Sequence, residues 1–136
     1  MIWKPSTTVA AVIEQNGKYL LVEEKQEPDS GLFLQGAIRE TLEETAYTFV
    51  PEYLIGIYQW HSKRADTTYI RFAFAGSITQ HDPHRTLDDG IVRATWFDFS
   101  EISQQINRHR SPLVMQCILD HRNGRQFPLD LIKHYD

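Results

Sequence analysis

The most informative stretch of this chain is Arg39-Glu40-Thr41-Leu42-Glu43-Glu44-Thr45. On a helix, Glu40 lies three residues before Glu43 and four before Glu44, so the three carboxylates project from neighbouring positions of one face. Like charges at this spacing repel, and within the helix only Arg39 offsets them. Converging carboxylate oxygens are the ligands that a hard divalent cation prefers. An inert acidic surface helix explains the spacing equally well, and the spacing alone does not decide between the two interpretations.

A helix is expected around this stretch, over residues 34–47. Its apolar residues recur every fourth position, and no proline interrupts them. Upstream, the apolar runs 6–14 and 18–23 flank a turn that contains Asn16-Gly17. Asn-Gly between two such runs is the strongest short signal of a β-hairpin.

Downstream of this helix, strand-like and helix-like segments follow one another closely. We expect strands over residues 53–60 and 67–78, a polar loop over 79–90, a strand over 91–99, and helices over 100–106 and 113–121. Ser100 and Ser111 are expected to cap these two helices. The strands lie too close together for a helix to cross over between each pair. The sequence therefore predicts an α/β (α+β) fold with a mixed sheet and helices packed on it.

The composition indicates one domain, residues 1–136. The chain is 41% hydrophobic and 12% aromatic, which is enough for one core at this length but too little for two. Its net charge of −4 offers no broad basic surface, which argues against a nucleic-acid polymer as partner. The single cysteine, Cys117, has no intrachain disulfide partner, and no apolar run approaches the roughly 20 residues that cross a bilayer. We therefore expect a cytoplasmic protein without a membrane partner.

Residues 39–47 resemble the second half of the Nudix box, G-x5-E-x7-R-E-U-x-E-E-x-G-U, in which U is a bulky apolar residue. Thr41 stands where the motif has its first apolar residue, and Ala46 stands where it has its last glycine. The order of hairpin, acidic helix, strands and later helices also resembles Nudix hydrolases over nearly the whole chain. The resemblance implies a Nudix-type α/β/α sandwich and an enzyme that hydrolyses acid anhydrides with Mg²⁺, or with Mn²⁺ in its place.

Segments outside the box resemble one subgroup in particular, the bacterial phosphatases called NudJ. These segments are 59–60, 71–74, 110–114 and 127–129. The resemblance implies hydrolysis of nucleoside tri- and diphosphates, and of the pyrimidine pyrophosphate precursor of thiamine, with release of phosphate. Three alternatives remain open: a Nudix enzyme for a damaged or sugar nucleotide, a catalytically inactive Nudix module that binds a nucleotide, and a plain acidic scaffold. The sequence does not separate a monomer from a homodimer.

The resemblance also assigns roles to the acidic helix. Glu40 and Glu44 would bind the metal ion directly, and Glu43 would bind a second ion or a metal-bound water. Arg39 would orient the carboxylates by a charge-assisted hydrogen bond, so the catalytic set is Arg39, Glu40 and Glu43. For the catalytic base, Glu40 is one candidate and Asp88 or Asp89 another. Since Asp89-Gly90 is also good turn chemistry, the turn is the favoured interpretation of the aspartates.

Candidates for substrate binding lie on the predicted strands and the loop after them. Arg71 could contact a substrate phosphate or reach solvent. Trp60, Phe72 and Phe74 could stack on a flat ring, although strand aromatics more often belong to the core. Asp89 completes this set. The six histidines lack metal-ligand spacing and are expected at the surface.

The first half of the Nudix box is missing. Counting back from Arg39 puts Gly31 where the first box glutamate belongs and Lys25 where its glycine belongs. The flanks of the missing part resemble the family on both sides of Phe33-Leu34. We therefore expect that about a dozen residues belong between Phe33 and Leu34 in the natural protein. A natural deletion is the alternative, and it would put activity in doubt.

Overall fold

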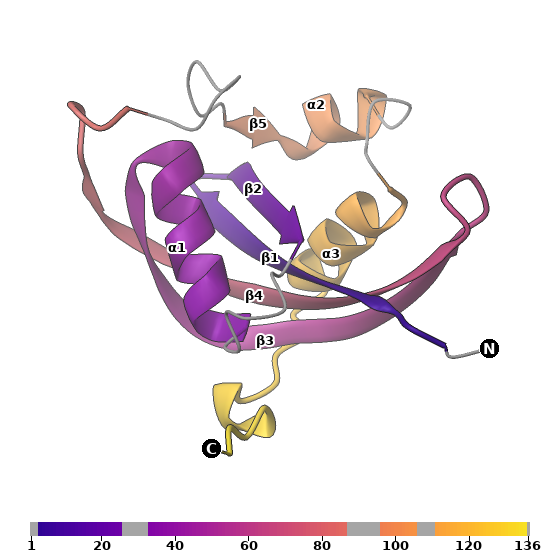
Figure 1. Cartoon of the computed structure of the whole chain (residues 1–136). Helices are drawn as coiled ribbons and strands as arrows, with labels where there is room; N and C mark the ends of the chain where they lie inside the picture. Colours follow the sequence, from indigo (N-terminus) through magenta and orange to yellow (C-terminus); the bar gives the residue numbers. More distant parts are fainter. Residues whose placement is uncertain (1–2, 26–32, 87–95, 106–110, 136) are drawn as a thin grey trace.

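The computed structural model describes residues 3–25, 33–86, 96–105 and 111–135. The strands are β1 (Ser6–Gln15), β2 (Lys18–Lys25), β3 (Tyr47–Ser62), β4 (Thr67–His81) and β5 (Phe97–Asp98). The helices are α1 (Phe33–Thr45), α2 (Phe99–Gln104) and α3 (Leu113–Arg122), followed by the short 3₁₀ turn η2 (Leu129–Leu131). Figure 1 shows their arrangement. In the described part of the chain, no helix is long and apolar enough to cross a membrane.

The five strands form one mixed sheet in the order β3-β4-β1-β2-β5. β1 pairs with β4 in parallel, and the other neighbours pair antiparallel. The β1–β2 hairpin turns at Asn16 and Gly17, whose φ angles of 53° and 81° are both positive. Positive φ at both central residues defines the turn that Asn-Gly favours. The mixed sheet and this hairpin confirm the prediction.

Helices cover both faces of the sheet. Along β1, Val9, Ala11 and Ile13 belong to the core cluster that includes Ala37 of α1. The alternating residues Ala10 and Val12 belong to a second cluster, which includes residues of α2 and α3. Successive side chains of a strand point to opposite faces, so α1 lies on one face and α2 and α3 on the other. This is the predicted α/β/α sandwich (Figure 1).

The acidic helix is confirmed, but it ends two residues earlier than predicted. Ala46 has a φ of +64°, in the left-handed region, and its N–H donates to the carbonyl of Leu42 at 2.9 Å. A left-handed residue with this bond is a common way to end a helix. The chain therefore turns at Ala46, and Tyr47 starts β3 instead of closing α1.

Other boundaries also differ from the prediction. The β3–β4 hairpin is confirmed, but both strands are longer than expected. The late strand is described only as β5, and residues 91–95 of the predicted strand lie outside the described part. The predicted cap Ser100 is wrong, because the Asp98 carboxylate accepts the N–H of Glu101 at 2.8 Å while the Glu101 side chain accepts the N–H of Asp98. At α3 the N-cap residue is Pro112 and not the predicted Ser111, although the Ser111 hydroxyl, one residue earlier, accepts the N–H of Leu113 at 3.2 Å.

α1 begins at Phe33 and runs without interruption through the junction with Leu34. The expected extra segment between these two residues stays a prediction. The chain ends in a segment that returns to β3, where Leu54 and Phe127 exchange two backbone hydrogen bonds of 2.8 Å.

Candidate active site

The carboxylates of the acidic helix α1 lie between the buried core and solvent. Glu40 is 7% exposed, which is unusual for a carboxylate. The Arg39 Nη2 donates to Glu40 Oε1 at 3.1 Å, and the Arg39 Nε lies 4.0 Å from Glu43 Oε1. One guanidinium therefore contacts two of the three carboxylates.

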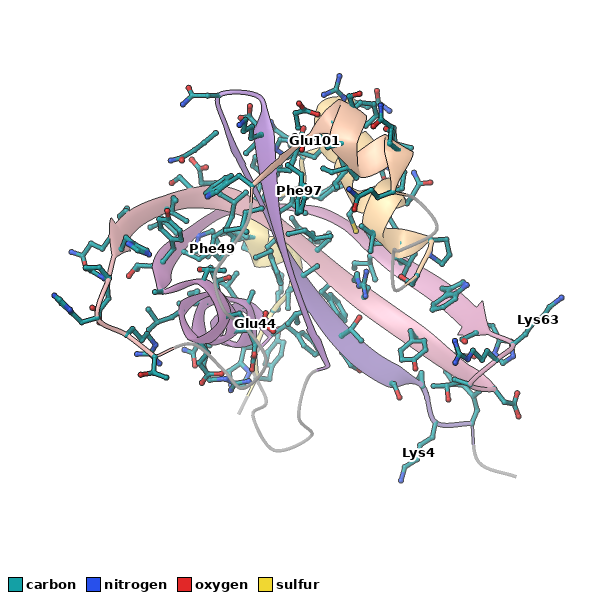
Figure 2. The ribbon with its side chains drawn as sticks, turned by 90° about the horizontal axis from the view of Figure 1, so that it is seen from above. Lys4, Glu44, Phe49, Lys63, Phe97 and Glu101 are labelled. Atoms are coloured by element: carbon teal, nitrogen blue, oxygen red, sulfur yellow. The ribbon has the colours of Figure 1, made fainter. Side chains whose placement is uncertain are left out.

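Glu43 and Glu44 are more accessible than Glu40. The Glu43 side chain keeps 33% of its surface exposed, and Glu44 is half-buried. Figure 2 marks Glu44 at α1, far from the β3–β4 turn that is marked by Lys63. Among the residues that the structure describes, no three His, Cys, Asp or Glu side chains are already arranged to hold a metal ion.

These carboxylates nevertheless suit Mg²⁺. That ion keeps several waters and takes only one or two protein carboxylates together with substrate phosphate oxygens. A closed three-residue cage is therefore not required, and the oxygen donors of Glu40 and Glu44, one helical turn apart, are of the right kind.

Arg71 and Trp60 lie on the opposite face of the sheet from α1. Arg71 is the direct register partner of Tyr58, whose hydroxyl donates to Asp120 of α3 at 2.7 Å. Trp60 pairs with Tyr69, and their rings stack with centroids 5.6 Å apart and an interplanar angle of 19°. All four β3 and β4 side chains therefore share the face that carries α3.

Arg71 does not reach solvent, against one of the two interpretations of the sequence. It is 6% exposed, and its Nε donates to Thr8 Oγ1 at 3.2 Å. Thr8 and Tyr69 are not among the residues predicted from the sequence. Tyr69 lies two residues before Arg71, so strand alternation could have indicated it, but nothing local connects Thr8 to Arg71 before the β1–β4 pairing is known.

Phe72 and Phe74 point to the α1 face, away from Trp60. Phe74 is 1% exposed and belongs to the core, while Phe72 stacks on Phe33 with ring centroids 4.3 Å apart. The structure thus does not bring Trp60 together with these two rings. Asp88 and Asp89, the other candidates of the sequence, lie outside the described residues.

The expectation that all histidines lie at the surface is wrong for His121. This side chain of α3 is half-buried between Tyr19 and Tyr53, and its Nδ1 lies 3.1 Å from the Tyr19 hydroxyl. Burial lowers the pKa of His121, while Glu14 nearby opposes that shift and Arg122 adds to it. On the same face, burial and then the bond to Asp120 raise the pKa of the Tyr58 hydroxyl.

Known proteins place these features in a family, although no family model matches the chain. The chain is 33% identical to "Phosphatase NudJ" of Escherichia coli K12 over 147 aligned residues, which cover 99% of this chain and 95% of the relative. The same protein of Shigella flexneri matches equally well. Since this chain has 136 residues, about a dozen aligned positions of the relative have no counterpart in it.

Solved structures agree. A "NUDIX hydrolase from Nitrosomonas europaea" superposes with a TM-score of 0.91 at 47% identity, covering 97% of this chain and 98% of the other. A UDP-X diphosphatase superposes with a TM-score of 0.70 at 15% identity, covering 93% and 67%, which supports the fold alone. The chain therefore belongs to the Nudix hydrolase family and is a pyrophosphohydrolase related to phosphatase NudJ.

Proposed function

We propose that this enzyme uses Mg²⁺, bound directly by Glu40 and Glu44 while Glu43 binds a second ion or a metal-bound water, to release orthophosphate from small pyrophosphates. Its substrates would be nucleoside tri- and diphosphates and a pyrimidine pyrophosphate of the thiamine-precursor type. The observation that carries the proposal is the near-buried Glu40 contacted by Arg39 on a helix with two further carboxylates. The relationship to phosphatase NudJ supports the release of phosphate, and the choice of substrates rests on the resemblance of the sequence to that subgroup. The single buried cysteine supports a cytoplasmic location.

Phosphoanhydride cleavage needs little covalent chemistry from a protein, because it depends on charge neutralisation and on an aligned water. A bound Mg²⁺ would supply the neutralising charge. The role of the protein is to hold the carboxylate oxygens in place. Arg39 does this for Glu40 and Glu43, and it offsets the repulsion between them. Glu40 is the candidate that accepts the proton of the attacking water, whose oxygen bonds to phosphorus as the bridging P–O bond breaks.

The flat ring of the substrate would bind on the α1 face of the sheet, the face that carries the carboxylates. Phe72 lies on that face and stacks on Phe33 with ring centroids 4.3 Å apart. Trp60 and Arg71 lie on the opposite face, so they are not placed to bind a small substrate whose phosphates contact Glu40. The stacking proposal therefore narrows to Phe72, because Phe74 is 1% exposed. A stacking surface reads ring shape more than hydrogen-bonding pattern, and discrimination between bases should be loose.

The second candidate function is nucleotide binding without turnover. It is favoured by the absence of the first half of the Nudix box, because that half would supply a further carboxylate near the metal. Another Nudix substrate, a damaged or sugar nucleotide, is the alternative within enzymes.

A substrate panel tests the proposal. The panel contains nucleoside tri- and diphosphates, a pyrimidine pyrophosphate, a nucleoside diphosphate sugar and a dinucleoside polyphosphate, each with and without Mg²⁺. We expect Mg²⁺-dependent orthophosphate from the first three and little from the last two. Inorganic pyrophosphate as the first product of a triphosphate would contradict the proposal, because attack would then occur at an inner phosphorus. Nucleotide binding without any product would identify the inactive module.

A further inference from the structure

The long strand β3 forms one edge of the sheet. In the order β3-β4-β1-β2-β5, it has β4 on one side and no strand on the other. On this outer side Phe127 exchanges two backbone hydrogen bonds of 2.8 Å with Leu54, and no other described residue bonds to the outer side of the strand backbone. Figure 1 shows this edge running on to the β3–β4 turn. An uncovered edge presents backbone N–H and C=O groups that can pair with a further strand.

The first half of β3 carries features that prevent such pairing. Pro51 has no backbone N–H, and the register with β4 shifts at three places between Tyr47 and Gly56. Phe127 covers Leu54. Proline, irregular pairing and a covering segment are the usual ways in which proteins block an edge strand. This half of β3 is therefore closed to another chain.

The second half of β3, residues 57–62, has none of these features. Its residues pair one to one with β4, from Ile57 opposite Phe72 to Ser62 opposite Thr67, without a register shift. The segment contains no proline, lysine, arginine, aspartate or glutamate. Ile57 keeps 52% of its surface exposed. A regular, uncharged edge with an exposed apolar side chain is a template for pairing with a strand of another chain.

The charges at the two ends of this segment favour a second copy of the same chain as the partner. Glu52 precedes the segment, and Lys63 and Arg64 follow it; all three are exposed. In an antiparallel pair related by a two-fold axis, the end of each strand lies beside the beginning of the other. Lys63 and Arg64 of each copy then approach the part of β3 that carries Glu52 in the other. Opposite charges meet at both ends, and residues 53–62 bring no like charges together.

We propose that the protein forms a two-fold symmetric homodimer in which residues 57–62 of the two copies pair antiparallel and join the two sheets edge to edge. Because both copies use the same edge, the assembly closes at two chains. Gln59 lies near the middle of the segment, so its two copies meet close to the two-fold axis. The inference does not rest on the proposed function, since the paired segment contains no residue of the acidic helix.

Sedimentation velocity at several protein concentrations tests the proposal. At about 100 μM we expect a species of two chains and no larger one. Gln59→Lys places two like charges close to the axis, and Ile57→Lys adds a charge to the exposed edge. Each should weaken the dimer by about tenfold or more. An equimolar mixture of Gln59→Lys and Gln59→Glu should form a dimer again, because opposite charges then face each other.

Gln80→Lys is the matched control. Gln80 is an exposed glutamine of β4, at the opposite end of that strand from the residues that pair with 57–62. It makes the same change of charge and should leave the dimer unaffected. A monomer at about 100 μM would overturn the inference, as would an assembly larger than two chains. So would a dimer that Gln59→Lys and Ile57→Lys leave intact, or one that Gln80→Lys weakens equally.

Discussion

Ala46 is the residue at which the chain departs most clearly from favourable backbone geometry. Its φ of +64° lies in the left-handed region, where a side chain with a Cβ is disfavoured by roughly 1–2 kcal/mol. Glycine has no such penalty and is the usual residue at this position after a helix. The Nudix motif indeed has glycine here, as the sequence comparison with the box indicates.

Ala46→Gly should therefore raise the free energy of unfolding, by up to about 1 kcal/mol after the greater chain entropy of glycine is subtracted. Urea unfolding at equilibrium measures it. Ala37→Gly is the control of opposite sign: Ala37 is a buried residue inside α1, and glycine there should cost about 1 kcal/mol or more. A lower stability of Ala46→Gly would contradict the left-handed assignment.

Gly76 of β4 is a second position where the residue type follows from geometry. A Cβ at Gly76 would lie 2.1 Å from the carbonyl oxygen of Val50 and 2.8 Å from the Cα of Pro51, both in the β3 backbone. Gly76→Ala should cost about 3 kcal/mol or more, because backbone atoms of a paired strand must move. At Gly56 a Cβ would meet only the Tyr58 side chain, at 3.0 Å, so Gly56→Ala should cost much less. Equal thermal midpoints for the two variants would refute this account.

At the scale of elements, α3 contacts the sheet through His121, a side chain whose protonation depends on pH. Because burial lowers the pKa of His121 below its usual 6.5, the unfolded chain binds this proton first as the pH falls. The contribution of neutral His121 to the free energy of unfolding is thus fully present above about pH 6.5, and it decreases as the pH falls below that value. Unfolding free energies measured from pH 8 to pH 5 should fall more steeply for the unaltered protein than for His121→Gln. Parallel curves would show that His121 does not titrate as the structure indicates.

Elements were predictable from the sequence where a local signal was strong. Asn16-Gly17 specified the β1–β2 turn, and the four-residue repeat specified α1. The end of α1 was misplaced because periodicity continues through Ala46 although the backbone does not. The cap of α2 was misplaced because Asp98 and Ser100 are both good caps, and only the bond to Glu101 decides between them.

The candidate site was predictable in its chemistry but not in its layout. The spacing of the glutamates and of Arg39 was sufficient to find the acidic face of α1. Strand alternation separates Arg71 from Phe72, but it does not say which face α1 covers, since that depends on the order of the strands in the sheet. For this reason Trp60, Phe72 and Phe74 were grouped in one set that the sheet divides between its two faces.

At the scale of the whole molecule, we predict that the natural chain is longer than 136 residues. About a dozen aligned positions of phosphatase NudJ lack a counterpart here. A pocket of about 380 Å³ opens at the predicted junction, and its walls include Phe33, Leu34, Leu129 and Ile132. We propose that the natural protein carries the extra residues between Phe33 and Leu34. The intact mass of the protein from its source should then exceed 15.9 kDa by about a dozen residues. A mass equal to that value would instead establish a natural deletion.

The central claim is that the acidic helix is the metal site of a pyrophosphohydrolase, and Glu44→Gln tests it most directly. The experiment measures kcat for a nucleoside diphosphate with Mg²⁺, and the thermal midpoint in metal-free buffer. We expect kcat to fall by about 100-fold while the midpoint is unchanged or raised, because a metal ligand and a source of like-charge repulsion are lost together. Glu52→Gln, at an exposed position of β3, is the control and should keep full turnover. Full Mg²⁺-dependent turnover by Glu44→Gln would contradict the claim and make the three carboxylates an inert acidic surface.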